Sequence, residues 1–279
     1  DIRLPGMLRG KILGSPHPPA RILSIDTREA ESLPGVHAVI TAKDVPDVPY
    51  GVSPARYDER VLAADRVRHI GDEIAAVAAV DDETAERALA LIRVEYEVLP
   101  AVFTVEEALA PGAPLLHDEY PQNVNTEIQH DFGDVEKAFA EADLVREDVF
   151  HGQRAMQNPL EPHVSLASVD TDGRITLWTA NQAPHYVQHQ LSRVLGQPMG
   201  RIRVIKPAMG GGFGGKAEAT SLDFCSVILA RKTGRPVLME YSRSEMYLHG
   251  RGRHAQVIKL KTGVRKDGTL LAVHADILL

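Results

Sequence analysis

"MGGGFGGKAEAT", residues 209–220, holds five glycines within positions 210–215, interrupted only by Phe213. Glycine loses more backbone freedom on folding than any other residue, so such a run is costly in an ordered chain. Either something approaches this backbone closely, or the chain turns where side chains cannot fit. A strand-like stretch (201–207) precedes the run and a helix-like stretch (217–234) follows it. The sequence therefore predicts a strand, a glycine loop and a helix, with the loop as the candidate site.

A dinucleotide site is one interpretation of this loop. Gly210, Gly212 and Gly215 satisfy G-x-G-x-x-G, and Glu240 closes the following strand near the place of a ribose-binding acid. The bulky Phe213 within the turn argues against it. A hairpin and a helix lead into the loop where a βαβ repeat is expected, which also argues against it. An NAD(P)-dependent dehydrogenase that uses residues 210–215 stays open as an alternative.

Two other anion sites are compatible with the same residues. Gly210 to Lys216 gives G-x-x-x-x-G-K, but a phosphate-binding loop needs Ser or Thr next to hold magnesium, and Ala217 stands there. Alternatively, the backbone N–H groups of a glycine loop leading into a helix bind an oxygen-rich anionic cofactor. Phe213 would then lie beside its reactive centre.

The composition is that of an ordinary globular chain, with 279 residues, 44% hydrophobic and 25% charged. A net charge of −7 without a long basic run argues against a nucleic-acid partner. The longest apolar stretches are about seven residues, whereas a membrane span needs roughly 20. No secretory signal opens the sequence, so we expect a soluble, cytoplasmic protein.

The single cysteine, Cys225, excludes an internal disulfide and an iron–sulfur cluster held by this chain alone. It lies in an apolar, helix-like stretch, where we expect it to be part of the core. The chain starts without methionine and stops in an apolar run, so we expect a piece of a longer protein.

Strand-like and helix-like segments alternate and predict a mixed α/β fold. Expected strands are 20–27, 36–45, 72–80, 94–99, 144–152, 201–207 and 235–242, with a hairpin over 163–181; expected helices are 27–35, 82–92, 134–142, 183–196 and 217–234. The proline-rich stretch 111–127 indicates a linker between domains 1–110 and 128–279.

The loop sequence GGGFGGK after a strand resembles the molybdenum-cofactor loop of the molybdenum hydroxylases, the xanthine dehydrogenase and aldehyde oxidoreductase family. Residues 4–27, 35–45, 67–102, 160–167 and 177–185 resemble further family segments in the same order. The resemblance implies an α+β fold. A small hammerhead-like α/β domain (1–110) would precede the first part of a molybdopterin-binding α/β domain (128–279). Within the family, the overall phrasing of the sequence resembles the large subunit of 4-hydroxybenzoyl-CoA reductase, with no single diagnostic residue behind the resemblance.

The resemblance also implies site residues. Gln182 matches a glutamine that hydrogen-bonds an oxygen ligand of molybdenum, a task that suits a neutral amide; a turn glutamine is the plainer interpretation. Gly212, Phe213 and Gly214 match the stretch whose backbone lies against the metal's ligands, and Gly211 belongs to the same cofactor site. Core packing is the plainer role for Phe213. We expect Gln182 and Phe213 to act in catalysis without binding the metal directly.

One position departs from the purine-oxidising members of the family, which have glutamate directly after the lysine. Ala217 stands there, and the acid falls one position later, at Glu218. On a helix one residue turns the side chain by about 100°, so Glu218 should not substitute and a purine substrate is disfavoured. We interpret Glu218 as a solvated acid in the first helical turn.

Three other polar features have two interpretations each. His163 would face the cofactor or be a satisfied structural histidine. Lys216 would meet a phosphate or lie on the surface. The basic stretch HGRGRH (249–254) would touch an anionic substrate tail or cofactor phosphate, but we favour a solvated basic loop.

The resemblance finally implies the chemistry and the partners. An aromatic, heterocyclic or aldehyde substrate would be hydroxylated, or reductively dehydroxylated, at a molybdenum–molybdopterin cofactor or its cytosine dinucleotide form. The general-base glutamate lies in a later part of the family's catalytic chain, so this chain alone should not catalyse. Implied partners are the remainder of the catalytic subunit, a [2Fe-2S] subunit and usually an FAD subunit, together forming an oligomer. A non-catalytic chain that serves only in assembly stays open.

Overall fold

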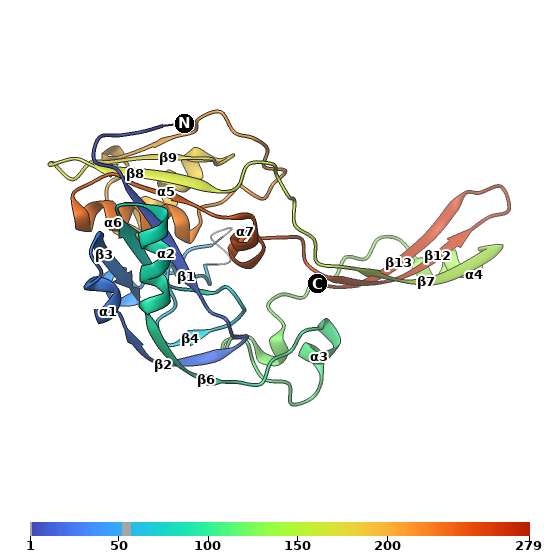
Figure 1. The fold of residues 1–279 in the computed structure, drawn as a ribbon. Coiled ribbons are helices and arrows are strands. Elements are labelled where there is room, and N and C mark those ends of the chain that lie inside the picture. Colours follow the sequence, from blue (N-terminus) through green and yellow to red (C-terminus); the bar gives the residue numbers. More distant parts are fainter. Residues whose placement is uncertain (1, 52–56) are drawn as a thin grey trace. The chain divides into compact units, whose positions relative to one another are not determined.

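A mixed seven-stranded sheet brings together stretches far apart in the sequence. In the computed structural model, which describes residues 2–51 and 57–279, its strand order is β10-β9-β8-β11-β1-β5-β3. The strands are β1 (Leu8–Gly14), β3 (Val36–Thr41), β5 (Glu73–Ala79), β8 (Val164–Val169), β9 (Ile175–Thr179), β10 (Ile202–Ile205) and β11 (Val237–Glu240) (Figure 1). β11 pairs in parallel with β1 and antiparallel with β8. It therefore joins the strands β10, β9 and β8 to the strands β1, β5 and β3.

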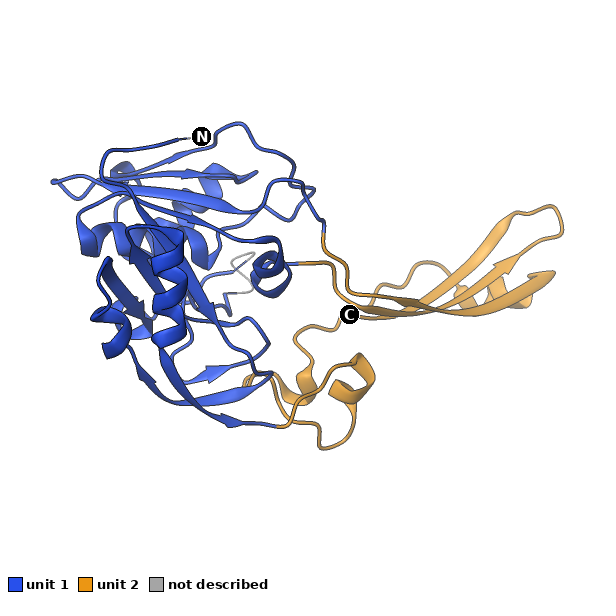
Figure 2. Cartoon of the chain, in the orientation of Figure 1, with its two compact units in different colours: residues 1–99, 157–251 blue, residues 100–156, 252–279 orange. Residues whose placement is uncertain are grey.

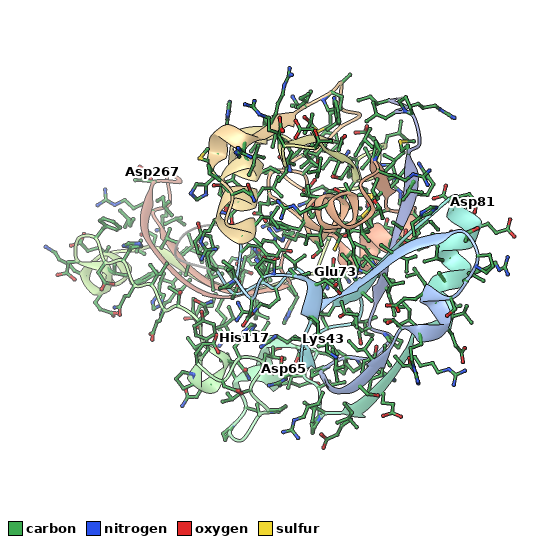
Figure 3. All side chains as sticks on the ribbon, turned by 90° about the vertical axis from the view of Figure 1, so that its left-hand side faces the viewer. Lys43, Asp65, Glu73, Asp81, His117 and Asp267 are labelled. Carbon is green, nitrogen blue, oxygen red and sulfur yellow. The ribbon has the colours of Figure 1, made fainter. Side chains whose placement is uncertain are left out.

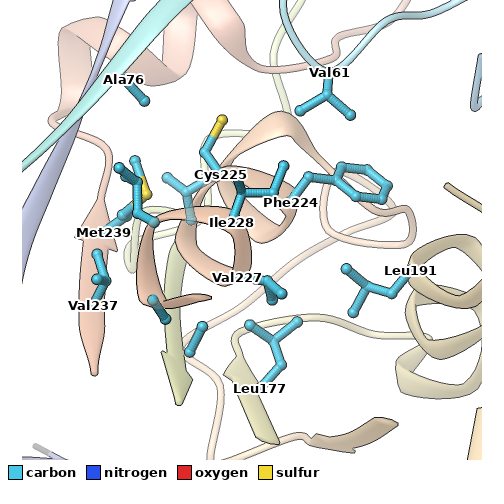
Figure 4. Packing of buried hydrophobic residues seen from close by; sticks show 14 of the residues in the cluster. Val61, Ala76, Leu177, Leu191, Phe224, Cys225, Val227, Ile228, Val237 and Met239 are labelled. Atoms are coloured by element: carbon cyan, nitrogen blue, oxygen red, sulfur yellow. The ribbon is translucent and has the colours of Figure 1, made fainter. Parts of the chain in front are cut away.

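Helix α6 (Ser221–Thr233) forms the centre of the core against this sheet. Every residue from Ser221 to Ala230 is buried, because the helix is apolar on nearly all sides and contacts β8, β11 and β3. A capping box of Thr220 and Asp223 starts the helix, and Gly234 in the left-handed conformation ends it. Figure 4 shows the side chains of Cys225 and Val227 within this packing.

The remaining helices lie around the same sheet. α2 (Asp82–Leu91) contacts β1, β5 and α1 (Arg28–Glu31), and α5 (Pro184–Leu195) contacts β10. A separate three-stranded sheet has the order β4-β2-β6, formed by β2 (Ala20–Asp26), β4 (Arg66–Val67) and β6 (Arg93–Val98). Short elements complete this part: the 3₁₀ helices η1 (Ala42–Asp44) and η3 (Met199–Arg201), and α7 (Arg243–His249).

Contacts divide the chain into two units, coloured in Figure 2: unit 1 comprises residues 1–99 and 157–251, and unit 2 comprises residues 100–156 and 252–279. Unit 2 contains the sheet β13-β12-β7, built from β7 (Leu144–Gly152), β12 (Gln256–Val264) and β13 (Leu270–Leu278). It also contains α3 (Val105–Leu109), η2 (Pro121–Asn123) and α4 (Val135–Ala140). α4 packs on β12 and β13.

The predicted elements are present, but several ends differ: the strand predicted at 36–45 stops at Thr41, where η1 begins, and the helix predicted at 27–35 covers only Arg28–Glu31. The strands β1 and β12 were not predicted. The strand predicted at 144–152 coincides with β7, and the predicted hairpin is β8 and β9. The helix expected from residue 217 begins at Ser221 instead, because Thr220 caps it. The division into domains 1–110 and 128–279 with a linker at 111–127 stays a prediction. The two contact units divide the chain differently, because strands from both predicted domains form the seven-stranded sheet. No helix in 2–51 or 57–279 has the length and hydropathy for crossing a membrane.

Candidate functional site

The glycine loop turns through left-handed backbone conformations. Gly211 and Gly214 have φ of 97° and 88°, where side chains are strained and glycine is not. Phe213 between them also has a positive φ, 53°, which is uncommon for a bulky residue. Its side chain is 74% exposed at the loop. Core packing is therefore the wrong interpretation of Phe213; the ring lies on the surface of the loop.

The other three glycines have no room for a side chain. A Cβ at Gly212 would lie 2.5 Å from Gln182 Oε1. Added Cβ atoms at the two outer positions would be similarly close to the side chains of a segment before β8: Gly210 to Glu161 Cβ (2.7 Å) and Gly215 to Gln157 Oε1 (2.8 Å). One side of the loop thus packs against the side chains of Gln182, Glu161 and Gln157.

Gln182 is joined to the loop by three hydrogen bonds. Its side-chain Oε1 accepts from the backbone N–H groups of Gly214 (3.0 Å) and Lys216 (3.3 Å), and its backbone N–H donates to the Lys216 carbonyl (2.7 Å). Two donors facing one end of the amide place the oxygen there and the NH₂ group at the other end. Among the described residues, none accepts a hydrogen bond from Nε2 of Gln182. The predicted glutamine and loop are thus brought together, and neither N–H donor of the Nε2 group has an acceptor in the described part of the chain, where this side chain is exposed.

Lys216 lies in the interior, so of its two interpretations the surface position is wrong. The side chain is fully buried, and Nζ donates to Glu161 Oε2 at 2.8 Å. The N–H of Gly210 donates to the same oxygen at 2.9 Å. Burial alone would raise the pKa of Glu161, but the bonds from Lys216 and Gly210 lower it below its usual value. This carboxylate is therefore ionised at neutral pH.

His163 also contacts the loop. Its Nε2 lies 3.0 Å from the carbonyl of Gly215, which can only accept, so Nε2 carries the proton. Nδ1 is buried without a hydrogen-bond partner among the described residues. Burial lowers the pKa of His163 to about 4, so the ring is neutral. His163 thus holds the loop by its backbone.

Glu218 is not a solvated acid of a first helical turn. It precedes the Thr220 cap, and its carboxylate forms an ion pair with Arg251, which also pairs with Glu59. Residues 249–254 are accordingly not a fully solvated basic loop, because Arg251 is engaged. The Nδ2 of Asn181 donates to the Glu218 carbonyl at 2.6 Å, a role that nothing in the sequence indicates.

A second polar group, missed in the sequence, lies at the start of β5. Burial raises the pKa of Glu73 to about 8, and the hydroxyl of Tyr241 donates to its Oε1 at 3.3 Å. His249 Nδ1 lies 3.7 Å from the same oxygen. Figure 3 shows Glu73 in the inner part of the view and Asp81, the exposed cap of α2, near its margin. The Glu73 carboxyl group is therefore protonated at neutral pH.

The geometry does not favour the dinucleotide interpretation. The glycines end five residues before α6, whereas the fingerprint places its loop directly at the helix N-terminus. Two strands, β9 and β8, lie between β10 and β11 in the sheet. Glu240, the expected ribose-binding acid, lies 3.9 Å from Arg9. Backbone and amide donors of an open loop remain, and they suit an oxygen-rich anionic group.

The chain matches two family models in order. Residues 1–100 match the a/b hammerhead domain of aldehyde oxidase and xanthine dehydrogenase, and residues 116–279 match a molybdopterin cofactor-binding domain. A probable xanthine dehydrogenase subunit from Bacillus subtilis is 40% identical over 98% of this chain and 36% of its own length. The nicotinate dehydrogenase large molybdopterin subunit of Eubacterium barkeri is 35% identical over 99% of this chain and 64% of its length. The chain thus spans only part of these relatives.

Solved structures agree with the models. Quinoline 2-oxidoreductase from Pseudomonas putida 86 superimposes with a TM-score of 0.91 at 32% identity, covering 99% of this chain and 36% of the other. Aldehyde oxidoreductase from Desulfovibrio gigas gives 0.89 at 30% identity, over 99% and 31%. The mixed α/β fold, the hammerhead match and the molybdopterin-domain match confirm what the loop sequence implied. The chain belongs to the molybdenum hydroxylase family, that of aldehyde oxidase and xanthine dehydrogenase.

Proposed function

We propose that this chain forms one wall of the molybdenum-cofactor site of an oxidoreductase. The enzyme would hydroxylate, or reductively dehydroxylate, an aromatic, heterocyclic or aldehyde substrate. The observation that carries the proposal is the amide of Gln182, whose oxygen is held by two loop N–H groups while its Nε2 has no acceptor among the described residues. A fixed, neutral donor of this kind suits an oxygen ligand of a metal group.

The residues present fit such a group. Gln182 Nε2 would donate to one of its oxygen ligands, and the backbone of Gly211, Gly212, Phe213 and Gly214 would lie against it. The molybdenum–pterin group, when bound, supplies a two-electron redox centre. The exposed ring of Phe213 would cover the open side and limit the access of water to the substrate.

The names of relatives support the substrate class, since they include enzymes of nicotinate, quinoline and aldehydes. Ala217 and the paired state of Glu218 leave no free carboxylate next to Lys216, which supports a substrate other than a purine. We further propose a cytosine dinucleotide form of the pterin, partner [2Fe-2S] and FAD subunits, a general-base glutamate outside this sequence, an oligomer, and a cytoplasmic location.

Two substitutions at Gln182 test the proposal in the native complex that contains this chain. Gln182→Glu keeps an acceptor for the N–H groups of Gly214 and Lys216 but replaces the Nε2 donor with an anionic oxygen. Gln182→Ala removes both. Anaerobic dye reduction with a panel of aldehydes and N-heteroaromatics should fall by about 10- to 100-fold in both variants. Gln129→Ala, an exposed glutamine of unit 2, is the matched control. Full activity of Gln182→Glu would contradict the proposal.

A further inference from the structure

The segment before β8 holds both ends of the glycine loop through one carboxylate. Oε2 of Glu161 accepts from the N–H of Gly210, the first loop glycine, and from Nζ of Lys216, the residue after the last. The N–H of Glu161 in turn donates to the Gly210 carbonyl at 3.2 Å. A side chain 55 positions away from Lys216 therefore connects the entry and the exit of the loop.

Because the Lys216 side chain is buried, its ammonium group depends on Glu161 for a partner. Its ammonium is fully buried, while Glu161 keeps 30% of its side chain exposed. A buried ammonium needs a paired charge, and among the described residues Glu161 is the carboxylate within ion-pair distance of Nζ. Because the Lys216 backbone N–H donates to Gln182, displacing the Lys216 side chain also moves a bond that holds Gln182.

We propose that Glu161 and Lys216 are positioning residues that set the conformation of the glycine loop, and through it the direction of the Gln182 amide. His163 assists at Gly215, where its Nε2 donates to the carbonyl. The inference rests on the proposed function only for what the loop faces; the conformation itself can be measured without any cofactor.

Three variants separate positioning from mere stability. Glu161→Leu removes the acceptor, Lys216→Met removes the cation, and Glu161→Gln keeps an acceptor oxygen for Gly210 while removing the charge. Lys11→Met is the matched control, because Lys11 forms an ion pair with Glu86 (3.4 Å) that involves no residue of the loop or of α6. Hydrogen–deuterium exchange of the peptide 209–217 is the readout, with the α6 peptide 221–233 as internal reference.

The measurement uses the native complex from cells grown with and without molybdate. Glu161→Leu and Lys216→Met should raise exchange in 209–217 at least tenfold in both preparations, with α6 unchanged, and Glu161→Gln should restore part of the protection. Lys11→Met should leave both the loop and α6 unchanged. Loop exchange that stays at the wild-type rate, or that rises equally in α6, would overturn the inference. If Lys216→Met does not fold, Glu161→Gln against wild type decides alone. Molybdenum content, measured separately, reports on the proposed function and not on this inference.

Discussion

Gly212→Ala is the most direct probe of the contact between the loop and Gln182. The φ of Gly212 lies outside the left-handed region, so alanine meets no backbone strain there. Its methyl group would lie 2.5 Å from Gln182 Oε1, whereas ordinary van der Waals contact begins at 3.4 Å. The amide must therefore withdraw by about 0.9 Å. That displacement breaks or badly weakens the bonds from Gly214 and Lys216.

The magnitude follows from these two bonds. Each bond contributes roughly 0.5–1.5 kcal/mol, so the free energy of unfolding of the variant should be about 1–3 kcal/mol lower than that of wild type. The same displacement should lower the occupancy of the proposed cofactor. Urea unfolding and molybdenum content, both measured on the native complex, are the assays. Gly200→Ala is the control, because an added Cβ there meets nothing within 4 Å.

A double-mutant cycle makes the test specific. In a Gln182→Ala background the methyl group that Gly212→Ala introduces no longer meets an amide, so Gly212→Ala should cost clearly less there than it does in wild type. If Gly212→Ala proved as silent as Gly200→Ala, or if the two substitutions were additive, the account of the Gln182 contact would be refuted.

Three further predictions concern unit 1. In the folded state the Glu73 carboxyl group keeps its proton up to about pH 8, whereas in the unfolded state it loses the proton near pH 4.5. Between these two pH values the folded state binds more protons than the unfolded state. The free energy of unfolding therefore falls as the pH rises. Urea unfolding at pH 7 to 8 should show a fall in the free energy of unfolding of up to about 1.4 kcal/mol per pH unit. Glu73→Gln should remove this fall, and equal slopes in the two proteins would speak against a protonated Glu73. Glu218→Gln should lower the free energy of unfolding, measured by thermal denaturation, by up to about 1 kcal/mol, because it removes the charge that pairs with Arg251; a solvated Glu218 would show no cost. Leu229→Ala, at a fully buried position of α6, should cost about 2–5 kcal/mol in urea unfolding, and a cost below about 1 kcal/mol would contradict the packing.

Local pattern was enough to predict most of the elements, but β1 and β12 were missed and not all ends were right. Thr220 and Asp223 form a T-x-x-D capping signal that was visible in the sequence, yet the helix-favouring residues before it suggested an earlier start. The capping hydrogen bonds decided the boundary over intrinsic propensity. As a result the placement of Glu218 on a helical turn was also wrong.

The site was predictable where function depends on a continuous motif, and not where it depends on distant partners. Gln182 and the loop stand out in the sequence. The burial of Lys216 does not, since lysine is rarely buried unless paired, and its partner Glu161 is 55 positions away. Arg251 and Glu59 are likewise joined only by the fold.

The decisive measurement is the molybdenum and pterin content of the natively purified complex that contains this chain, with NAD(P) assayed in parallel. We expect close to one molybdenum and one pterin per chain, without bound NAD(P). An intact, active complex that lacked both and carried NAD(P) would contradict this expectation.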